Sequence, residues 1–321
     1  MLRIKLSFIP IVIGILLLPI TFPIYNKEVV IKVNKGENLD KIIKKLTKAR
    51  VIQDPYGFKI LVLLSKKNLN LSYGWYKLNI YENPRSVLEI LSKGKRMTVK
   101  VTILEGLRAY QILNLLERQT DMDVKKMDFL IHNRNFILTL GIDANSLEGY
   151  LFPDTYIFYM SEEPEQVLKK MVYRMFSILK PNDRIMIGSM EFNTHQILTI
   201  ASLIEKEAMV GFEKPLIASV IYNRLKKRMP LQIDATILFA LGQHKARVYY
   251  RDLKVQSPYN TYQHRGLPPG PIANPGYQSI LAALHPAKTD YYYYVATGKG
   301  DHIFTETYEE HIKAKRKIRN K

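Results

Sequence analysis

The sequence predicts an α+β protein in three parts: an N-terminal transmembrane helix, a small β-α-α-β subdomain and a larger domain of mixed helices and strands. Three observations support this division. Residues 8–25 are apolar, residues 28–97 alternate between strand-like and helix-like patterns, and residues 98–321 continue with mainly helical spacing before a proline-rich stretch. We therefore place the three parts at residues 1–27, 28–97 and 98–321.

The first part is predicted to be a membrane anchor. Residues 8–25 read FIPIVIGILLLPITFPIY, and a stretch of about 20 apolar residues can span a bilayer. Because Arg3 and Lys5 precede it, the positive-inside rule predicts a cytoplasmic N-terminus and export of everything that follows. The alternative is a cleaved signal peptide. No A-x-A-like site follows the apolar run, and Pro19 and Pro23 stand where small residues would be needed, which favours an anchor.

The composition restricts the classes of partner. The 321 residues include 48 Lys and Arg against 29 Asp and Glu, a formal net charge of +19. Such an excess favours a polyanion, whether nucleic acid, anionic lipid or a carboxylate-bearing cell-wall polymer. The predicted export argues against nucleic acid. Since the chain has no cysteine, disulfides, thiolate metal sites and a cysteine nucleophile are excluded.

The small subdomain at residues 28–97 is predicted from two strands that enclose two helices. Val29–Val33 and Tyr73–Ile80 have the pattern of strands. Between them, Leu39–Leu46 and Tyr56–Leu64 place apolar residues at helical spacing. Such a rhythm within a short stretch predicts a small independent module.

The larger domain begins with another strand, turn and helix. Thr98–Leu104 has the pattern of a strand, Glu105–Gly106 forms the turn, and Tyr110–Arg118 is predicted to be helical. Helical patterns predominate as far as about residue 241. Prolines then crowd the chain, and Tyr291–Ala296 is predicted to be a strand because aromatic and β-branched residues favour pleated surfaces.

The chain lacks several familiar catalytic motifs. It has no H-E-x-x-H, G-x-S-x-G, P-loop or G-x-G-x-x-G sequence, and no two histidines are spaced i, i+4. No metal or other cofactor is therefore predicted, and carboxylates remain as the candidates for chemistry.

The helix predicted at His195–Ala208 carries two glutamates on different faces. At about 100° per residue, Glu205 lies near Ala201 on the apolar side, whereas Glu207 lies roughly opposite. A carboxyl group among apolar neighbours is desolvated, which favours its protonated form. Cleavage of a glycosidic bond needs such a protonated acid. From the helix alone, a buried ion pair of Glu205, for example with Arg224, remains an open alternative.

Three further carboxylates have both a structural and a functional interpretation. Asp234 precedes an apolar helical run, so N-capping explains it most economically. Glu148 and Asp154 lie in the aromatic segment LEGYLFPDTY, where a carboxylate can line a sugar-binding cleft or hold the loop. The proline-rich segment GLPPGPIANPG, residues 266–276, can likewise form a cleft wall or a rigid connector.

Five blocks of the larger domain resemble the endolytic murein transglycosylases of the MltG, or YceG-like, family. The blocks are LEGYLFPDTY (147–156), ASLIEKEA (201–208), SVIYNRLKKRMPLQIDATILFALG (219–242), SPYNTYQHRGLPPGPIANPG (257–276) and LHPAKTDYYYYVATGKGDHIFTETYEEH (284–311). The resemblance implies an exported, single-pass enzyme of the bacterial inner membrane. Such an enzyme cleaves nascent glycan strands between N-acetylmuramic acid and N-acetylglucosamine, leaves 1,6-anhydro ends and terminates elongation.

The resemblance also implies site residues and partners. Glu205, the first glutamate of ASLIEKEA, corresponds to the family's catalytic residue, and residues 28–97 resemble its LysM-like subdomain. Ala208 stands where the family often has threonine, so Ser202, Gln232 or a backbone group would have to orient Glu205. Substrate-binding residues expected from the blocks are Glu148, Asn223, Arg224, Gln232, Asp234, Tyr259, Asn260 and Tyr262.

The expected partners are peptidoglycan glycan strands, membrane lipid and peptidoglycan synthases, with no role for nucleic acid. A non-catalytic alternative shares most of these features, namely a membrane-anchored cell-wall-binding scaffold that recruits the synthases. The discriminating residue is Glu205, because only the enzyme needs its carboxyl group.

Overall fold

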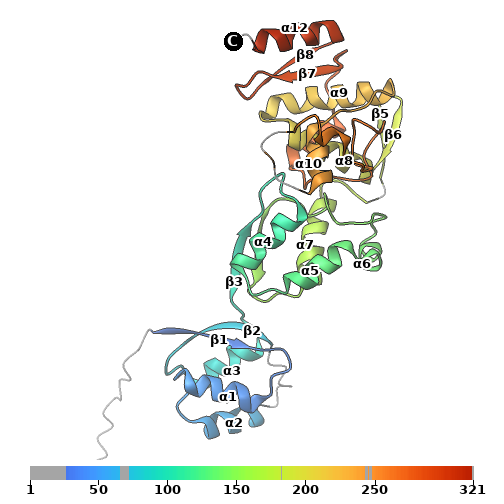
Figure 1. Cartoon of the computed structure of the whole chain (residues 1–321). Coiled ribbons are helices and arrows are strands. Elements are labelled where there is room, and N and C mark those ends of the chain that lie inside the picture. Colours follow the sequence, from blue (N-terminus) through green and yellow to red (C-terminus); the bar gives the residue numbers. More distant parts are fainter. Residues whose placement is uncertain (1–26, 66–71, 182, 243–244, 246–247, 320–321) are drawn as a thin grey trace, which may run out of the picture. The chain divides into compact units, whose positions relative to one another are not determined.

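The protein is described by a computed structural model in which two compact units divide between Lys95 and Arg96 (Figure 1). The described residues are 27–65, 72–181, 183–242, 245 and 248–319. The predicted membrane anchor, residues 8–25, lies outside them. Among the helices that are described, none is both long and apolar enough to cross a membrane.

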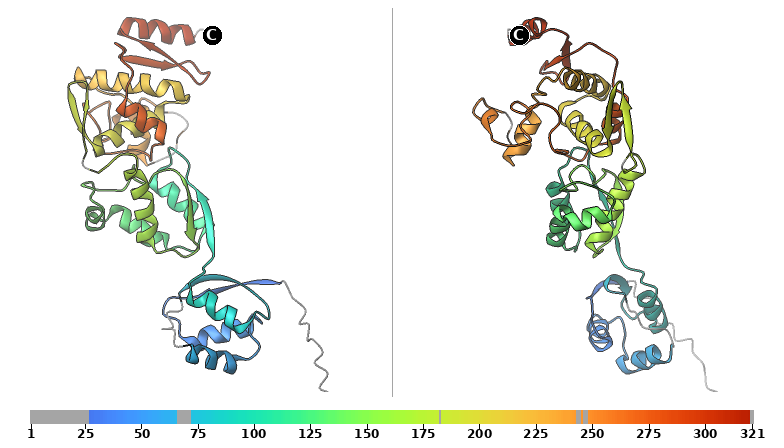
Figure 2. Two further views of the ribbon diagram at one scale, coloured as in Figure 1. Left: turned by 180° about the vertical axis from the view of Figure 1, so that it is seen from behind. Right: turned by 90° about the vertical axis from the view of Figure 1, so that its right-hand side faces the viewer.

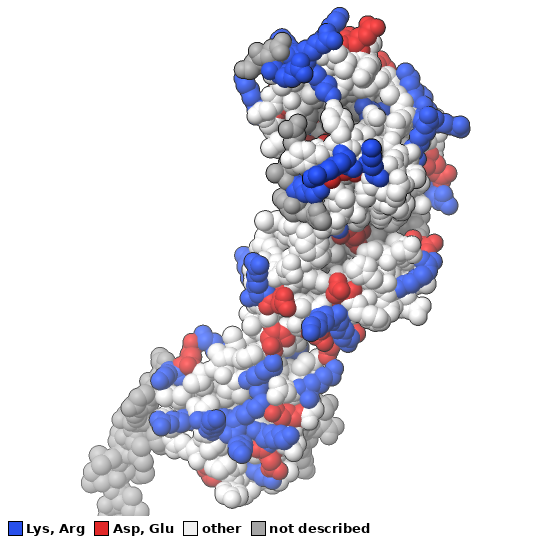
Figure 3. Space-filling view, viewed as in Figure 1, with Lys and Arg blue, Asp and Glu red and all other residues white. Residues whose placement is uncertain are grey.

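The N-terminal unit pairs β1 (Glu28–Val33) with β2 (Gly74–Asn79) in an antiparallel sheet. Helices α1 (Leu39–Lys48) and α2 (Pro55–Leu64) lie between the strands in sequence, and α3 (Pro84–Ser92) follows them. The apolar faces of the helices and strands share one core. The order of strand, helix, helix and strand agrees with the prediction. Figure 3 shows Lys and Arg side chains, interspersed with Asp and Glu, on the viewed face of this unit.

The C-terminal unit is a mixture of helices and short strand pairs, which confirms the α+β class for the described part of the chain. Its first elements are β3 (Thr98–Thr102), α4 (Ala109–Gln119), α5 (Val124–His132), α6 (Arg134–Thr139), β4 (Thr155–Tyr159), α7 (Pro164–Phe176), β5 (Arg184–Ile187) and β6 (Met190–Asn193). The later elements are α8 (Thr194–Glu207), η1 (Gly211–Glu213), α9 (Lys214–Lys226), α10 (Asp234–Leu241), η2 (Asp252–Lys254), α11 (Tyr277–Leu284), β7 (Tyr293–Ala296), β8 (His302–Thr305) and α12 (Tyr308–Arg319).

The described strands of this unit pair as β3–β4, β5–β6 and β7–β8, all antiparallel. The β3–β4 pair joins distant parts of the chain and brings the turn at Glu105–Gly106 close to the segment before Thr155. The β5–β6 hairpin, which turns at Gly188, lies where helix was expected. Its strands have only four residues each, too few for a pattern of alternation to be recognised.

Helix α8 is buried on every side from Ile197 to Ile204 and packs against α9, α10 and α11. Thr199 and Ser202 are polar residues of this helix, but both are buried. Their hydroxyls donate to backbone carbonyls within the helix, at 2.8 and 2.7 Å. The buried surface of α8 is therefore wider than its apolar side alone. In the right-hand view of Figure 2, the orange segment that contains α10 and η2 projects to one side of the unit.

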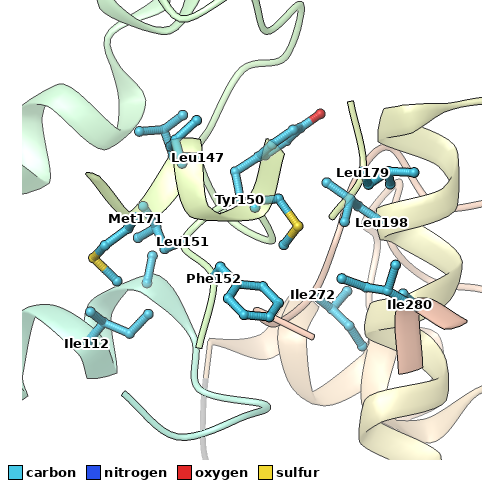
Figure 4. Packing of buried hydrophobic residues seen from close by; sticks show 14 of the residues in the cluster. Ile112, Leu147, Tyr150, Leu151, Phe152, Met171, Leu179, Leu198, Ile272 and Ile280 are labelled. Atoms are coloured by element: carbon cyan, nitrogen blue, oxygen red, sulfur yellow. The ribbon is translucent and has the colours of Figure 1, made fainter. Parts of the chain in front are cut away.

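The segment 147–152 joins the two halves of the C-terminal core (Figure 4). Leu151 lies on the side of Ile112 from α4, whereas Phe152 lies on the side of Ile272 and Ile280. All of these side chains are buried in one apolar cluster. The packing therefore fixes α4, α8 and the 266–276 loop against one another.

Candidate active site

Glu205 lies in the last turn of α8, and three donors converge on one of its carboxylate oxygens. Oε2 accepts hydrogen bonds from the Ser279 hydroxyl at 2.6 Å, the Gly276 N–H at 3.0 Å and the Lys214 ammonium at 3.3 Å. The side chains of Glu205 and Lys214 are 11% and 10% exposed. The ion pair is therefore largely desolvated but still reaches the surface.

The first turn of α11, which lies beside Glu205, adds to this support. Gly276 is the N-cap residue of α11 and Ser279 lies in its first turn, so the positive end of the helix dipole faces the carboxylate. Burial disfavours the negative charge, whereas the donors and the dipole favour it. No described residue donates a hydrogen bond to Oε1.

The turn after β3 covers the other side of the glutamate. Gly106 has φ +73°, and a Cβ at this position would lie 3.5 Å from Cγ of Glu205 and 3.9 Å from Oε1. The Gly106 N–H donates to the carbonyl of Asn274 at 2.9 Å. Asn274 is fully buried, so the turn and the segment before α11 form one rigid frame around Glu205.

Glu148 supports this frame rather than facing Glu205. It accepts hydrogen bonds from the backbone N–H of Ala109 at 3.0 Å and from the amide of Asn274 at 2.9 Å. Burial raises the pKa of the Glu148 carboxyl group to about 7, an effect that these hydrogen bonds and nearby Arg108 oppose. Its contacts match the loop-holding interpretation, while substrate binding by Glu148 stays a prediction.

The suggested ion pair between Glu205 and Arg224 is not formed. Arg224 instead donates to the carbonyls of Tyr292 at 2.6 Å and Leu231 at 2.7 Å, and Lys214 takes its place beside Glu205. The neighbouring Asn223 amide donates to the carbonyls of Thr289 and Tyr291, at 2.8 and 3.0 Å. Arg224 and Asn223 thus hold the chain that leads into β7.

Asp234 is the first residue of α10, and the N-cap is Ile233, so the predicted capping role of Asp234 is wrong. Its carboxylate accepts a hydrogen bond from the Tyr262 hydroxyl at 2.5 Å. Burial, followed by this contact, raises the pKa of the Tyr262 phenol. The side chain of the preceding Gln232 makes no hydrogen bond with the described residues, although its backbone N–H donates to the Thr261 carbonyl at 3.1 Å.

Asn260 and Tyr259 lie in the loop after η2. The buried Asn260 amide donates to the carbonyls of Leu253 and Val255 at 2.9 and 2.8 Å, and its oxygen accepts the Tyr262 N–H at 3.0 Å. The Tyr259 ring lies 4.6 Å from that of Phe239, and burial raises the pKa of its phenol. Within the described contacts, these residues organise the loop and do not touch Glu205.

Glu207 contacts a different part of the unit, as the helical geometry predicted. It accepts a hydrogen bond from the Tyr294 hydroxyl at 2.9 Å, and burial raises the pKa of its carboxyl group. Ser202, one candidate for orienting Glu205, instead accepts the Ile272 N–H at 3.0 Å. The observed orienting groups are the side chain of Ser279 and the backbone of Gly276.

Sequence reasoning allowed for a backbone group without identifying Gly276, and it missed Ser279 and Lys214. Ser279 lies in a short apolar helix and Lys214 precedes a proline, and neither context signals a catalytic partner. Only the packing of α9 and α11 against α8 reveals them.

The predicted cleft-wall loop does line a cavity, at the other end of α8 from Glu205. The cavity has a volume of about 790 Å³, and Pro268 and Pro269 line it together with His195. Nε2 of His195 donates to the Pro269 carbonyl at 2.9 Å, and its Nδ1 lies 2.9 Å from the Tyr150 hydroxyl. Glu205 lies ten positions after His195, which corresponds to about 15 Å along the helix.

Comparison with known proteins places this fold in a recognised family. A solved structure of a YceG-like protein from Listeria monocytogenes is 32% identical with a TM-score of 0.58, and the match covers 89% of this chain and 99% of that one. The YceG-like family matches residues 31–317, and the chain belongs to this family. The resemblance seen in the five sequence blocks is thereby confirmed.

Two curated relatives have the same name, which describes their activity. A Bacillus subtilis (strain 168) protein named endolytic murein transglycosylase is 38% identical over 303 residues, which cover 89% of this chain and 84% of the relative. A protein of the same name from Streptococcus pneumoniae serotype 2 is 30% identical over 319 residues, which cover 89% of this chain and 57% of that relative.

Proposed function

We propose that this protein is an endolytic murein transglycosylase, a lyase that cleaves peptidoglycan glycan strands between N-acetylmuramic acid and N-acetylglucosamine. The names of its relatives support the substrate class. The observation that carries the chemistry is the environment of Glu205, where all three donors hold Oε2 and none of the described groups holds Oε1. A carboxyl group held in this way has a fixed direction and one oxygen free for proton transfer.

The proposed reaction uses Glu205 twice. The protonated Oε1 donates its proton to the glycosidic oxygen, the bond from C1 of the muramyl residue to that oxygen breaks, and the N-acetylglucosamine hydroxyl leaves. The Glu205 carboxylate then takes the proton from the C6 hydroxyl of the muramyl residue while O6 bonds to C1. The products are a 1,6-anhydro end and a restored acid, and no water is consumed.

The donors to Oε2 have a role in the second step. When Glu205 has given up its proton, Lys214, Ser279 and the Gly276 N–H stabilise the resulting carboxylate in its partly buried position. They also keep it from rotating away, so the same oxygen can accept the C6 hydroxyl proton.

The remaining parts of the chain complete the proposal. Residues 1–27 form a single-pass anchor in the bacterial cytoplasmic membrane, with the N-terminus inside and the C-terminal unit outside. Residues 28–97 act as a LysM-like cell-wall-binding module, and peptidoglycan synthases are partners. The apolar segment at 8–25, the basic residues before it and the net charge of +19 support membrane and cell-wall contact.

Product analysis tests the reaction. We expect the full-length protein in detergent to release 1,6-anhydro-muramyl ends from un-crosslinked glycan strands, and Glu205→Gln to abolish them. Glu117→Gln is the matched control because Glu117 is exposed on α4 and makes no hydrogen bond or ion pair with the described residues. Reducing muramyl ends would identify a hydrolase instead and overturn the proposal.

Complementation separates the enzyme from the scaffold. We expect Glu205→Gln to fail to complement a deletion of the gene although the variant is present at normal level in the membrane. A variant that folds and still complements would establish the scaffold function.

A further inference from the structure

A second carboxylate, that of Glu105, lies beside the groups that hold Glu205. Glu105 belongs to the turn between β3 and α4, next to Gly106, whose backbone packs against the Glu205 side chain. A Cβ placed on Gly276 would overlap the carboxyl group of Glu105. The same Gly276 donates its N–H to Oε2 of Glu205. The two carboxyl groups therefore contact one glycine, on different sides of it.

A side chain at residue 276 would occupy the place of the Glu105 carboxyl group. Gly276 has φ −77° and ψ 170°, which any amino acid can adopt, so its backbone conformation does not require glycine. What glycine provides at this position is room for the Glu105 carboxyl group. The space beside Glu205 is thus shaped to admit a second carboxylate.

No structural role accounts for the Glu105 side chain. It is exposed and makes no hydrogen bond or ion pair with the residues that the structure describes. The turn itself is held by backbone contacts, with the Gly106 N–H on the Asn274 carbonyl and the Asn274 N–H on the Leu107 carbonyl, both at 2.9 Å. The Glu105 carboxyl group therefore has no partner among the described residues and lies next to the group that is proposed to transfer the proton.

We propose that Glu105 is a second catalytic residue, which contacts the muramyl ring bound at Glu205 and stabilises the positive charge that develops at its C1 and ring oxygen. This inference rests on the proposed transglycosylase function. Departure of the glycosidic oxygen leaves an electron-poor sugar until O6 bonds to C1. A carboxylate fixed nearby lowers the energy of that state more than that of the neutral ground state.

The two carboxyl groups lie in different environments, and each environment suits a different role in the reaction. Glu205 is largely buried and held by three donors, as an acid and base that exchanges one proton with the substrate requires. Glu105 is exposed and unpaired among the described groups, so its carboxyl group is accessible to a bound sugar. Sequence reasoning interpreted Glu105 only as part of a turn and assigned the reaction to a lone glutamate.

Initial rates of 1,6-anhydro end formation by the full-length protein in detergent test the inference. Glu105→Gln keeps the shape and removes the charge, so we expect kcat to fall about ten- to a hundredfold while KM stays within about threefold. The thermal unfolding midpoint should not change. Glu117→Gln, the exposed control on α4, should retain the wild-type rate.

Gly276→Ala provides an independent test, because it changes the position of the Glu105 carboxyl group without changing Glu105 itself. The added methyl group displaces the Glu105 carboxyl group but leaves the Gly276 N–H in place, so kcat should fall as in Glu105→Gln. In a Glu105→Ala background the same substitution should cost no further activity, because the displaced group is absent.

These measurements distinguish a failure of the role of Glu105 from a failure of the proposed transglycosylase function. A wild-type rate for Glu105→Gln, or a change in KM alone, overturns the role of Glu105. The proposed transglycosylase function is still supported in that case if Glu205→Gln is inactive. If Gly276→Ala lowers kcat equally with and without Glu105, the glycine acts on Glu205 directly and the inference fails. A wild-type protein that yields no 1,6-anhydro ends overturns both.

Discussion

The hydroxyl of Ser279 donates a 2.6 Å hydrogen bond to Oε2 of Glu205 across a separation of 74 residues. Ser279 is fully buried in the first turn of α11, and Glu205 lies in the last turn of α8. The contact shows how the packing of two helices, rather than any local motif, orients the proposed acid.

Removing this hydroxyl should reduce activity more than stability. We expect Ser279→Ala to lower kcat about tenfold, since Glu205 keeps its bonds to Gly276 and Lys214 but loses the shortest of the three. Stability should fall by only about 1 kcal/mol. Rates and thermal unfolding measure the two effects, with exposed Ser189→Ala as the control. A loss of stability without loss of kcat would contradict this prediction.

The titration of Glu148 should make stability depend on pH. Burial raises its pKa from 4.5 to about 7 on folding, so the folded protein binds this proton more tightly than the unfolded chain. The resulting stabilisation is fully present below about pH 4.5 and is lost as pH rises through about 7, an effect of up to about 3 kcal/mol.

Glu148→Gln cannot titrate and should therefore lack this contribution. Thermal unfolding of both proteins between pH 4.5 and 8 measures it, and the wild type should lose more stability than the variant as pH rises. Parallel curves would show that Glu148 has the same proton affinity in the folded and unfolded states.

Gly149 should be intolerant of any side chain. Its φ of +86° is strained for other residues, and a Cβ would overlap the ring of Pro271 in the cleft-wall loop. Gly141 is the matched control, because its φ of +76° carries the same backbone strain but nothing lies within 4 Å of its Cβ position.

We expect Gly141→Ala to cost about 1 kcal/mol and Gly149→Ala to cost several times more and to reduce activity. Thermal unfolding and rates of product formation measure the difference. Equal costs for the two variants would show that the Pro271 ring yields without consequence.

The two glutamates at the end of α8 should behave differently. Glu207→Gln retains an oxygen that accepts the Tyr294 hydroxyl, so we expect a folded enzyme with activity within a few-fold of wild type. Tyr294→Phe removes the donor from a buried carboxyl group and should cost about 1–3 kcal/mol of stability. An inactive but well-folded Glu207→Gln would place Glu207 in the chemistry.

Local elements were predictable because they depend on spacing and propensity. The helix expected at His195–Ala208 is observed at Thr194–Glu207, and the strand expected at Val29–Val33 begins one residue earlier. The β5–β6 hairpin was missed because four-residue strands have too little periodicity. The open alternative of an ion pair at Glu205 is met by Lys214 and not by the suggested Arg224, because Arg224 donates to backbone carbonyls.

The sequence by itself determined the α+β class, the family and the placement of Glu205 and Glu207 on different faces of α8, because helical periodicity separates those faces and the blocks are specific. Tertiary structure alone decided which groups surround Glu205. Lys214, Gly276 and Ser279 converge on one oxygen, and Glu105 occupies the space that Gly276 leaves open. These contacts arise from the packing of α8, α9 and α11 and from the β3–β4 pairing, and they join residues far apart in the chain, where no local pattern records them.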